Sequence, residues 1–306
     1  MKYVGVTGGQ GFIGGHVCDE LLRRGYRPVI FDRRMLPTPK GCDGFLGDVT
    51  DSTAVHELAA HVDGIIHLAA ILGTQETVKT PGPAVATNIT GALNVIDAAS
   101  SNGVPVVNIA VGNWWMRNSY STTKHCAERL FEQFRNEAGL AVNQVRVVNA
   151  YGPRQVAAKP YGPSKVRKIV TSFTCRALAG DPIEVYGDGL QVSDCVYVGD
   201  VASALVSALE HAADGDVFDR VVEVGPAEHH TVLDIARMVK AAAGSDSEIV
   251  HLPMRPGEEP GARVVADAST LPLVGMSADG LVPLTEGLAR TVEWFRAHEG
   301  VTWRRS

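Results

Sequence analysis

The sequence is poor in cysteine and in aromatic residues, and it has no long apolar run. Of its 306 residues 6% are aromatic and five are cysteines. The cysteines are scattered, odd in number and without the C-x-x-C spacing of metal or redox sites, so we interpret them as reduced core thiols. They are Cys18, Cys42, Cys126, Cys175 and Cys195. No stretch has the length of a membrane span and no basic, apolar leader precedes the first predicted strand, which predicts a cytoplasmic protein without a membrane partner.

The sequence also lacks a run of basic residues. Its formal net charge is -6, which argues against nucleic acid as a partner. His229 and His230 are adjacent, with no cysteine or acidic residue at a metal spacing, so we predict no metal site. His67, at a predicted strand end, is interpreted as a packed, hydrogen-bonded histidine.

A glycine-rich segment stands out instead. Residues 7–14 read Thr-Gly-Gly-Gln-Gly-Phe-Ile-Gly, between a predicted strand at 2–6 and a segment of helical period at 14–24. Glycines at such a turn let the backbone approach a pyrophosphate. The free N–H groups and positive dipole end of the following helix then face the anion. The segment therefore predicts a dinucleotide site.

The next predicted strand, at 29–31, ends in Asp32. It lies about 20 residues downstream of the glycines, where an acid binds the ribose hydroxyls of adenosine. A carboxylate would repel a 2′-phosphate, so we predict NAD rather than NADP as the cofactor. Arg33 and Arg34 follow directly and keep NADP open.

Strand-like runs alternate with helical patterns through the first half of the chain. Strands are predicted at 64–68, 104–109 and 142–148, and helices at 53–60, 85–100 and 120–138. This alternation predicts an α/β fold with a Rossmann-type doubly wound parallel sheet. After Tyr151 the composition becomes turn-rich, so we expect a smaller C-terminal substrate-binding lobe. We assign residues 1–151 and 193–225 to the dinucleotide-binding domain, and 152–192 and 226–306 to the lobe.

Tyr120 and Lys124 lie on one face of the helix predicted at 120–138, because residues four apart are neighbours on a helix. We expect Ser119 to be the N-cap and Gly139 to end the helix. A free tyrosine has a pKa near 10 and is a poor base. An adjacent ammonium and the positive ring of an oxidised nicotinamide would lower that pKa toward the working pH. Following a dinucleotide fingerprint, this otherwise common pair is predicted to be catalytic.

These segments together resemble the extended short-chain dehydrogenases/reductases, in the branch of nucleotide-sugar epimerases and dehydratases (UDP-glucose 4-epimerase-like). The resemblance covers nearly the whole chain. Its blocks follow the family's order: residues 7–14, Asp32, 47–49, 67–70, 88–91, Tyr120 with Lys124, 149–155, 186–189, 197–201 and 255–258.

The resemblance implies roles for individual residues. Tyr120 and Lys124 match the catalytic pair, and Asn149 and Arg255 would bind the nucleotide diphosphate. Arg255 also has a physical case, since a guanidinium forks onto phosphate oxygens. A surface arginine and a turn-forming asparagine are the alternatives. The implied cofactor-binding residues are Gly8, Gly11, Phe12, Ile13, Gly14, Asp32, Asp48, Val49, Leu68, Ala69, Ala70, Tyr120 and Lys124. A homodimer through paired helices is implied as well.

Two positions depart from the family's pattern. The family places a Ser or Thr after the strand ending near Ile109, but residues 110–112 are Ala, Val and Gly. Asn113, Ser119 or Thr122 could replace it. A Thr-Asp-Glu triplet is also absent there, which weighs against a 4,6-dehydratase. At the second position Ser193 stands where the family has an arginine that helps to hold the nucleotide.

The sequence therefore favours NAD-dependent epimerisation of a nucleotide-activated sugar, at C4, through a transient keto sugar. A nucleotide-sugar reductase, dehydrogenase or dehydratase that exchanges NAD(P) is the alternative within enzymes. A catalytically silent NAD-binding sensor is the alternative outside them.

Overall fold

A seven-stranded parallel sheet forms the centre of the protein. The computed structural model describes residues 1–34, 37–161 and 167–298. The strand order is β11-β6-β5-β4-β1-β2-β3, and every neighbouring pair is parallel. The strands are β1 (Tyr3–Thr7), β2 (Arg27–Asp32), β3 (Asp43–Leu46), β4 (Gly64–His67), β5 (Val106–Val111), β6 (Val142–Val147) and β11 (Val222–Val224). The predicted Rossmann-type doubly wound α/β fold is confirmed.

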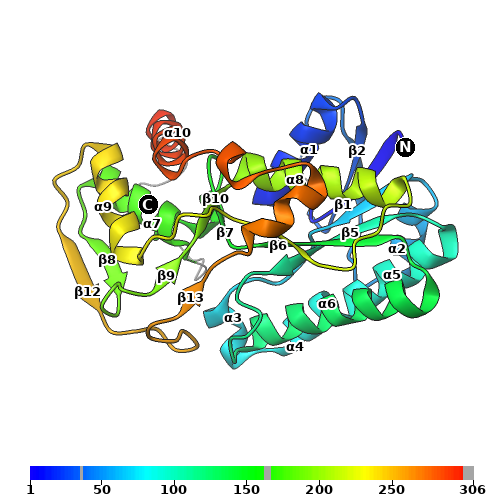
Figure 1. The fold of residues 1–306 in the computed structure, drawn as a ribbon, viewed down its shortest axis with the longest axis horizontal. Helices are drawn as coiled ribbons and strands as arrows, with labels where there is room; N and C mark the ends of the chain where they lie inside the picture. Colours follow the sequence, from blue (N-terminus) through cyan, green and yellow to red (C-terminus); the bar gives the residue numbers. More distant parts are fainter. Residues whose placement is uncertain (35–36, 162–166, 299–306) are drawn as a thin grey trace.

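Helices cover both faces of this sheet (Figure 1). One face carries α1 (Phe12–Arg23) and α8 (Val198–Ala213), which pack against each other. The other carries α2 (Ser52–Ala59), α5 (Gly91–Asn102) and α6 (Ser119–Ala138). Short helices α3 (Thr74–Lys79) and α4 (Gly82–Val85) and a π-helical turn η1 (Ala86–Thr90) precede α5. The helix predicted at 85–100 is thus a helical run that changes pitch at η1.

A second group of elements lies beside the sheet, at the left of Figure 1. Its apolar residues form a core of their own around α7 and α9. Its helices are α7 (Ile169–Ala179), α9 (Val232–Ala243) and α10 (Leu284–Ala297). Its strands pair as β8 (Ile183–Tyr186) with β12 (Ile249–Leu252), and β9 (Val192–Ser193) with β13 (Arg263–Val264). Between the groups, β7 (Asn149–Tyr151) pairs with β10 (Cys195–Tyr197). The domain boundaries given above stay a prediction.

Within the described ranges three short 3-10 helices complete the elements: η2 (Val156–Ala158), η3 (Ala268–Val274) and η4 (Ala278–Gly280). No helix of the described residues combines the length and the apolarity needed to cross a membrane.

The ends of α6 show which local signals the sequence carried. Gly139 ends the helix with a left-handed φ of +69°, as predicted. The predicted N-cap, Ser119, was wrong by one residue, because Asn118 caps the helix. Its side chain accepts a hydrogen bond from Ser121 N at 2.9 Å. Asn and Ser are about equally good caps, so propensity alone could not separate the two.

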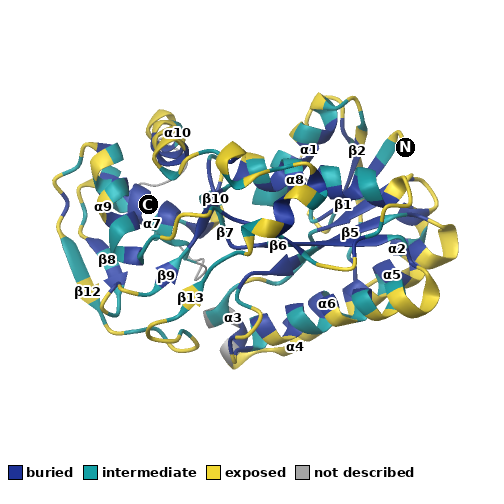
Figure 2. Ribbon diagram, in the orientation of Figure 1, coloured by how far each residue is buried: buried dark blue, intermediate teal, exposed yellow. Residues whose placement is uncertain are grey.

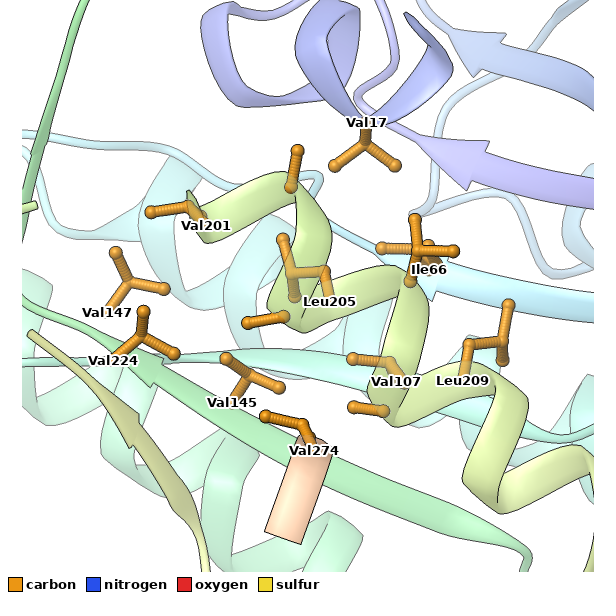
Figure 3. Packing of buried hydrophobic residues seen from close by; sticks show 14 of the residues in the cluster. Val17, Ile66, Val107, Val145, Val147, Val201, Leu205, Leu209, Val224 and Val274 are labelled. Atoms are coloured by element: carbon orange, nitrogen blue, oxygen red, sulfur yellow. The ribbon is translucent and has the colours of Figure 1, made fainter. Parts of the chain in front are cut away.

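Helix α8 is the centre of the larger core (Figure 3). Leu205 and Leu209 are fully buried in one cluster with Val17 of α1 and the strand residues Ile66 and Val107. Figure 2 shows the same pattern over the whole molecule, since the central strands and the inner sides of the helices are buried while the outer sides are exposed. Packing against α8 therefore fixes where the carboxyl ends of the strands lie.

Replacing Leu205 by Ala should lower the free energy of unfolding by about 2–5 kcal/mol, because it leaves a cavity in this core. Urea denaturation followed by circular dichroism measures the change. Leu190→Ala is the control, since Leu190 is 62% exposed and the change should stay within about 0.5 kcal/mol. Equal effects of the two variants would contradict this description of the core.

Candidate active site

A cleft of about 950 Å³ follows the carboxyl edge of the central sheet into the second group of elements. Strand order reverses at β1, and ligands of open α/β sheets bind in the crevice at such a switch point. The cleft brings together every residue that the sequence assigned to cofactor, substrate or catalysis. These residues are Gly8, Gly11, Phe12, Ile13, Gly14, Asp32, Asp48, Val49, Leu68, Ala69, Ala70, Tyr120, Lys124, Asn149 and Arg255. Their individual roles stay predictions.

The turn from β1 to α1 has no space for a side chain at Gly8 or at Gly14. Gly8 has a left-handed φ of +70°, and a Cβ on Gly14 would lie 2.5 Å from Gly8 O. Gly11 is the N-cap of α1 and makes no side-chain cap. The N–H groups of the first turn are thus available to a ligand. This cradle fits the pyrophosphate of a dinucleotide.

Thr7 is a contributor to this site that the sequence analysis did not single out. Its buried hydroxyl accepts hydrogen bonds from Leu68 N at 3.1 Å and Ala69 N at 3.2 Å. It also bonds His67 Nδ1 at 2.8 Å. Thr7 thereby fixes the loop after β4 against the end of β1. Burial and the charge of Lys124 lower the pKa of His67 to about 3, so His67 is neutral, packed and hydrogen-bonded, as expected.

Asp32 lies at the end of β2 with a side chain that is 8% exposed. Its carboxylate accepts hydrogen bonds from Gln10 N and Arg34 N, each at 3.1 Å. The guanidinium of Arg34 lies at 3.4 Å from the same carboxylate. The acid is therefore held in place at the adenosine end of the predicted cofactor site.

Asp48 and Val49 form the turn after β3. Asp48 Oδ1 accepts hydrogen bonds from Thr50 N and Thr50 Oγ1, both at 2.9 Å. Val49 is buried against Gly91, where a Cβ would lie 2.6 Å from Val49 Cγ2. Gly91 thus lets α5 approach this turn. Asn88 bonds Ile71 N at 2.8 Å and Thr123 Oγ1 at 3.0 Å.

Tyr120 and Lys124 occupy the first two turns of α6, and both line the cleft. Burial raises the pKa of Tyr120 to about 12. Burial also lowers the pKa of Lys124 to about 8, against the charge of Glu128, which raises it. Burial thus acts on the Tyr120 pKa in the direction opposite to the lowering expected from Lys124 together with an oxidised nicotinamide, and that lowering stays a prediction.

The loop between β5 and α6 decides which residue can replace the missing Ser or Thr. Of the three candidates, Asn113 lines the cleft. Its Nδ2 lies 3.2 Å from Sδ of Met116, which also lines the cleft. Ser119 starts the helix, and Thr122 is exposed. Asn113 is therefore the one of these three candidates that lines the cleft.

Asn149 and Arg255 lie on the substrate side. Asn149 Nδ2 donates to Ser193 Oγ at 2.7 Å and to the Asp194 carbonyl at 3.1 Å. The Arg255 guanidinium lies over the Tyr186 ring, 4.6 Å from its centroid, and pairs with Glu258. Within the described residues Arg255 Nε is a buried donor without a hydrogen-bond partner. Such a donor suits an anionic oxygen of a ligand.

Arg154 also lines the cleft, although the sequence analysis gave it no role beyond its place in the block 149–155. Its φ of +71° is left-handed, which is uncommon for a residue other than glycine. Its guanidinium pairs with Asp19 of α1 at 2.6 Å. The preceding Pro153 carbonyl lies 3.0 Å from His16 Nε2. The segment after β7 is therefore fastened to the helix that begins the cofactor site.

The comparison with known families fits this geometry. A sequence model of the NAD dependent epimerase/dehydratase family matches residues 4–115 and 109–225. The chain belongs to this family. The family resemblance stated from the sequence is thereby confirmed, and so is NAD as the cofactor of the family.

Individual relatives match over almost their whole length. The chain is 28% identical to a UDP-N-acetyl-alpha-D-glucosaminuronate decarboxylase of Bacillus cytotoxicus, covering 96% of this chain and 98% of the relative. The crystal structure of UDP-glucose 4-epimerase from Thermotoga maritima with UDP-glucose has a TM-score of 0.85 and 28% identity, covering 97% of this chain and 99% of that one. The UDP-glucose 4-epimerase of Thermus thermophilus in complex with NAD has a TM-score of 0.81 and 30% identity, covering 96% and 99%.

Gly14→Ala should weaken NAD binding about tenfold or more. The new Cβ forces the turn apart at a cost of about 1–3 kcal/mol, and each 1.4 kcal/mol is tenfold in affinity. Isothermal titration calorimetry measures the dissociation constant. Gly15→Ala is the matched control, because the nearest atom to its Cβ is Arg154 Nη1 at 3.9 Å. Wild-type affinity in Gly14→Ala would show that the turn does not hold the cofactor.

Proposed function

We propose that the protein epimerises a nucleotide-activated sugar at C4, with NAD oxidising and then reducing the same carbon. The observation that carries the proposal is the position of Tyr120 and Lys124. They line one continuous cleft between the glycine-rich turn and Arg255. A sugar bound through its diphosphate at Arg255 would thus reach the base and the cofactor together.

The chain's own residues divide the work as follows. Asp32 and the N-terminal turn of α1 hold the dinucleotide, and NAD when bound accepts and returns a hydride. Tyr120 Oη takes the proton of the sugar hydroxyl and gives it back after the keto sugar has turned. Lys124 stabilises the phenolate and holds the nicotinamide ribose. Because burial alone raises the pKa of Tyr120 to about 12, the two cationic charges of Lys124 and the oxidised cofactor must lower it for catalysis.

The substrate's remaining contacts follow from the cleft. Arg255 supplies a cation for the diphosphate, and Asn149 and Ser193 supply polar groups where the family's arginine is missing. Asn113, which lines the cleft, would bond the reacting hydroxyl. The second group of elements encloses the sugar and protects the keto intermediate from water. A homodimer, implied by the resemblance, belongs to the same proposal.

Epimerisation is favoured over loss of water by the loop between β5 and α6. Elimination needs an acid and a base beside the sugar in addition to Tyr120. Residues 110–119 contain no Asp or Glu. Decarboxylation is the second candidate, because the Bacillus cytotoxicus relative is a decarboxylase at 28% identity. Both reactions begin with the same oxidation at C4.

Product analysis separates these reactions. UDP-glucose, UDP-N-acetylglucosamine and UDP-glucuronic acid, each deuterated at C4, are incubated with the purified protein and examined by NMR and mass spectrometry. We expect the C4 epimer with its deuterium retained at C4 and with NAD unchanged overall. Loss of carbon dioxide from UDP-glucuronic acid would replace the proposal by decarboxylation, and loss of water by dehydration. NAD that binds without turnover of any of the three would favour the sensor.

Tyr120→Phe should lower kcat by about 10²–10⁴-fold, because it removes the acid–base group. Bound NAD, measured by absorbance after denaturation, should stay at the wild-type level. Thr122→Ala is the control, since Thr122 is exposed on the same turn of α6. Activity retained in Tyr120→Phe would remove Tyr120 from the mechanism.

A further inference from the structure

Below the catalytic pair lies a buried cluster of charges that the proposed mechanism does not use. Arg146 of β6 pairs with Glu223 of β11 at 2.5 Å and with Glu128 of α6. Arg146 and Glu223 are direct partners in the β6–β11 register. The side chains of Arg146 and Glu223 are 11% and 20% exposed, and Glu128 is 5% exposed. Charges this far from water need partners, since losing hydration costs several kcal/mol per ion.

Glu128 connects this cluster to Lys124. The two residues are four apart in α6, so they lie on the same face of the helix. Lys124 is 4% exposed. Glu128 Oε1 pairs with Arg146, whereas within the described residues Glu128 Oε2 has no hydrogen-bond partner. One oxygen of the Glu128 carboxylate is therefore not occupied by a hydrogen bond.

Among the residues that the structure describes, the other titratable groups around Lys124 do not supply a negative charge. His67 of β4 is neutral, because burial and Lys124 lower its pKa to about 3. Tyr120, on the preceding turn, is protonated in the protein alone, since burial raises its pKa. His125 Nδ1 lies 3.7 Å from Glu128 Oε2, and an imidazole side chain brings no carboxylate to this place. Glu128 is the carboxylate whose charge raises the pKa of Lys124 against the effect of burial.

The loop between β5 and α6, which also lines the cleft, covers one side of the cluster. The Trp114 ring lies over the Arg146 guanidinium, 5.6 Å from centroid to Cζ. The same ring lies 5.2 Å from the His125 ring. Trp114 thus shields the ion pairs from water and strengthens their fields. Asn113, its neighbour, lines the cleft.

We propose that Glu128 is a positioning residue for Lys124: its buried carboxylate, held by Arg146, is the counter-charge that keeps Lys124 a cation beside Tyr120. Lys124 and Arg146 then balance Glu128 and Glu223, two positive charges against two negative ones. The part played in catalysis rests on the proposed function, because that mechanism requires a cationic Lys124. The charge balance itself does not depend on the substrate.

The test is an NMR titration of Lys124 in protein carrying ¹³C at lysine Cε, with the Lys124 signal assigned by its loss in Lys124→Met. Removing the carboxylate charge destabilises the protonated amine, so the midpoint for Lys124 must move to lower pH. In Glu128→Gln we expect a shift of about one pH unit or more, a tenfold change in the acid dissociation constant. Glu132→Gln is the matched control. Glu132 lies one turn further along α6 in an exposed ion pair with Arg129. The Lys124 midpoint in Glu132→Gln should therefore equal that of the wild type.

A midpoint unchanged in folded Glu128→Gln overturns the proposal. Should that variant fail to fold, Glu223→Gln decides. Removing its charge leaves Arg146 less neutralised, so a smaller shift in the same direction supports the proposal and an unchanged midpoint overturns it. The alkaline limb of kcat should move to lower pH in parallel. Because the NMR titration needs no substrate, a wrong reaction assignment and a wrong role for Glu128 give different results.

Discussion

The approach of Gly14 to the backbone of Gly8 is the constraint on which the cofactor half of the cleft depends. With no side chain at Gly14, α1 begins directly against the end of β1, and its first N–H groups point to the carboxyl edge of the sheet. Thr7, the last residue of β1, then holds the loop after β4 beside this turn. On its other side α1 packs against α8, the centre of the larger core. The position of α1 is therefore common to the cofactor site and to the larger core.

Local patterns predicted the strands and helices that are apolar and regular. β1, β2, β4, β5 and β6 lie within two residues of their expected ranges, because most of their residues are buried and each contains at least two Val or Ile residues, which favour strands. β3 was not predicted. It has four residues that alternate between half-buried and exposed, at the edge of the sheet, and Asp43 and Gly44 disfavour a strand by propensity.

The site residues that the sequence located come from short contiguous motifs, such as residues 7–14 and the Tyr120–Lys124 pair. What it did not locate depends on contacts between distant positions. Arg146 and Glu223 are 77 residues apart in the chain, and the pairing of Arg154 with Asp19 spans 135. No periodicity connects such positions. The burial that raises the pKa of Tyr120 was not predicted for the same reason, since burial is a property of the folded surroundings rather than of the neighbour on the helix.

The path of the chain through the central sheet has a consequence for how the protein can be divided. After β6 the chain leaves to build α7, β8 and β9, and only then returns as α8 and β11 to complete the sheet. A fragment ending near residue 151 would carry the cofactor motif and the catalytic pair but would leave the edge of β6 unpaired and the face under α8 bare. Unpaired strand edges and exposed apolar faces favour aggregation. The part of the second group that lies between β6 and α8, with α7, β8 and β9, is thus topologically an insertion, whereas α9, β12, β13 and α10 follow the last strand of the sheet. Ribosomal synthesis must pass residue 224 before the nucleotide-binding half can close.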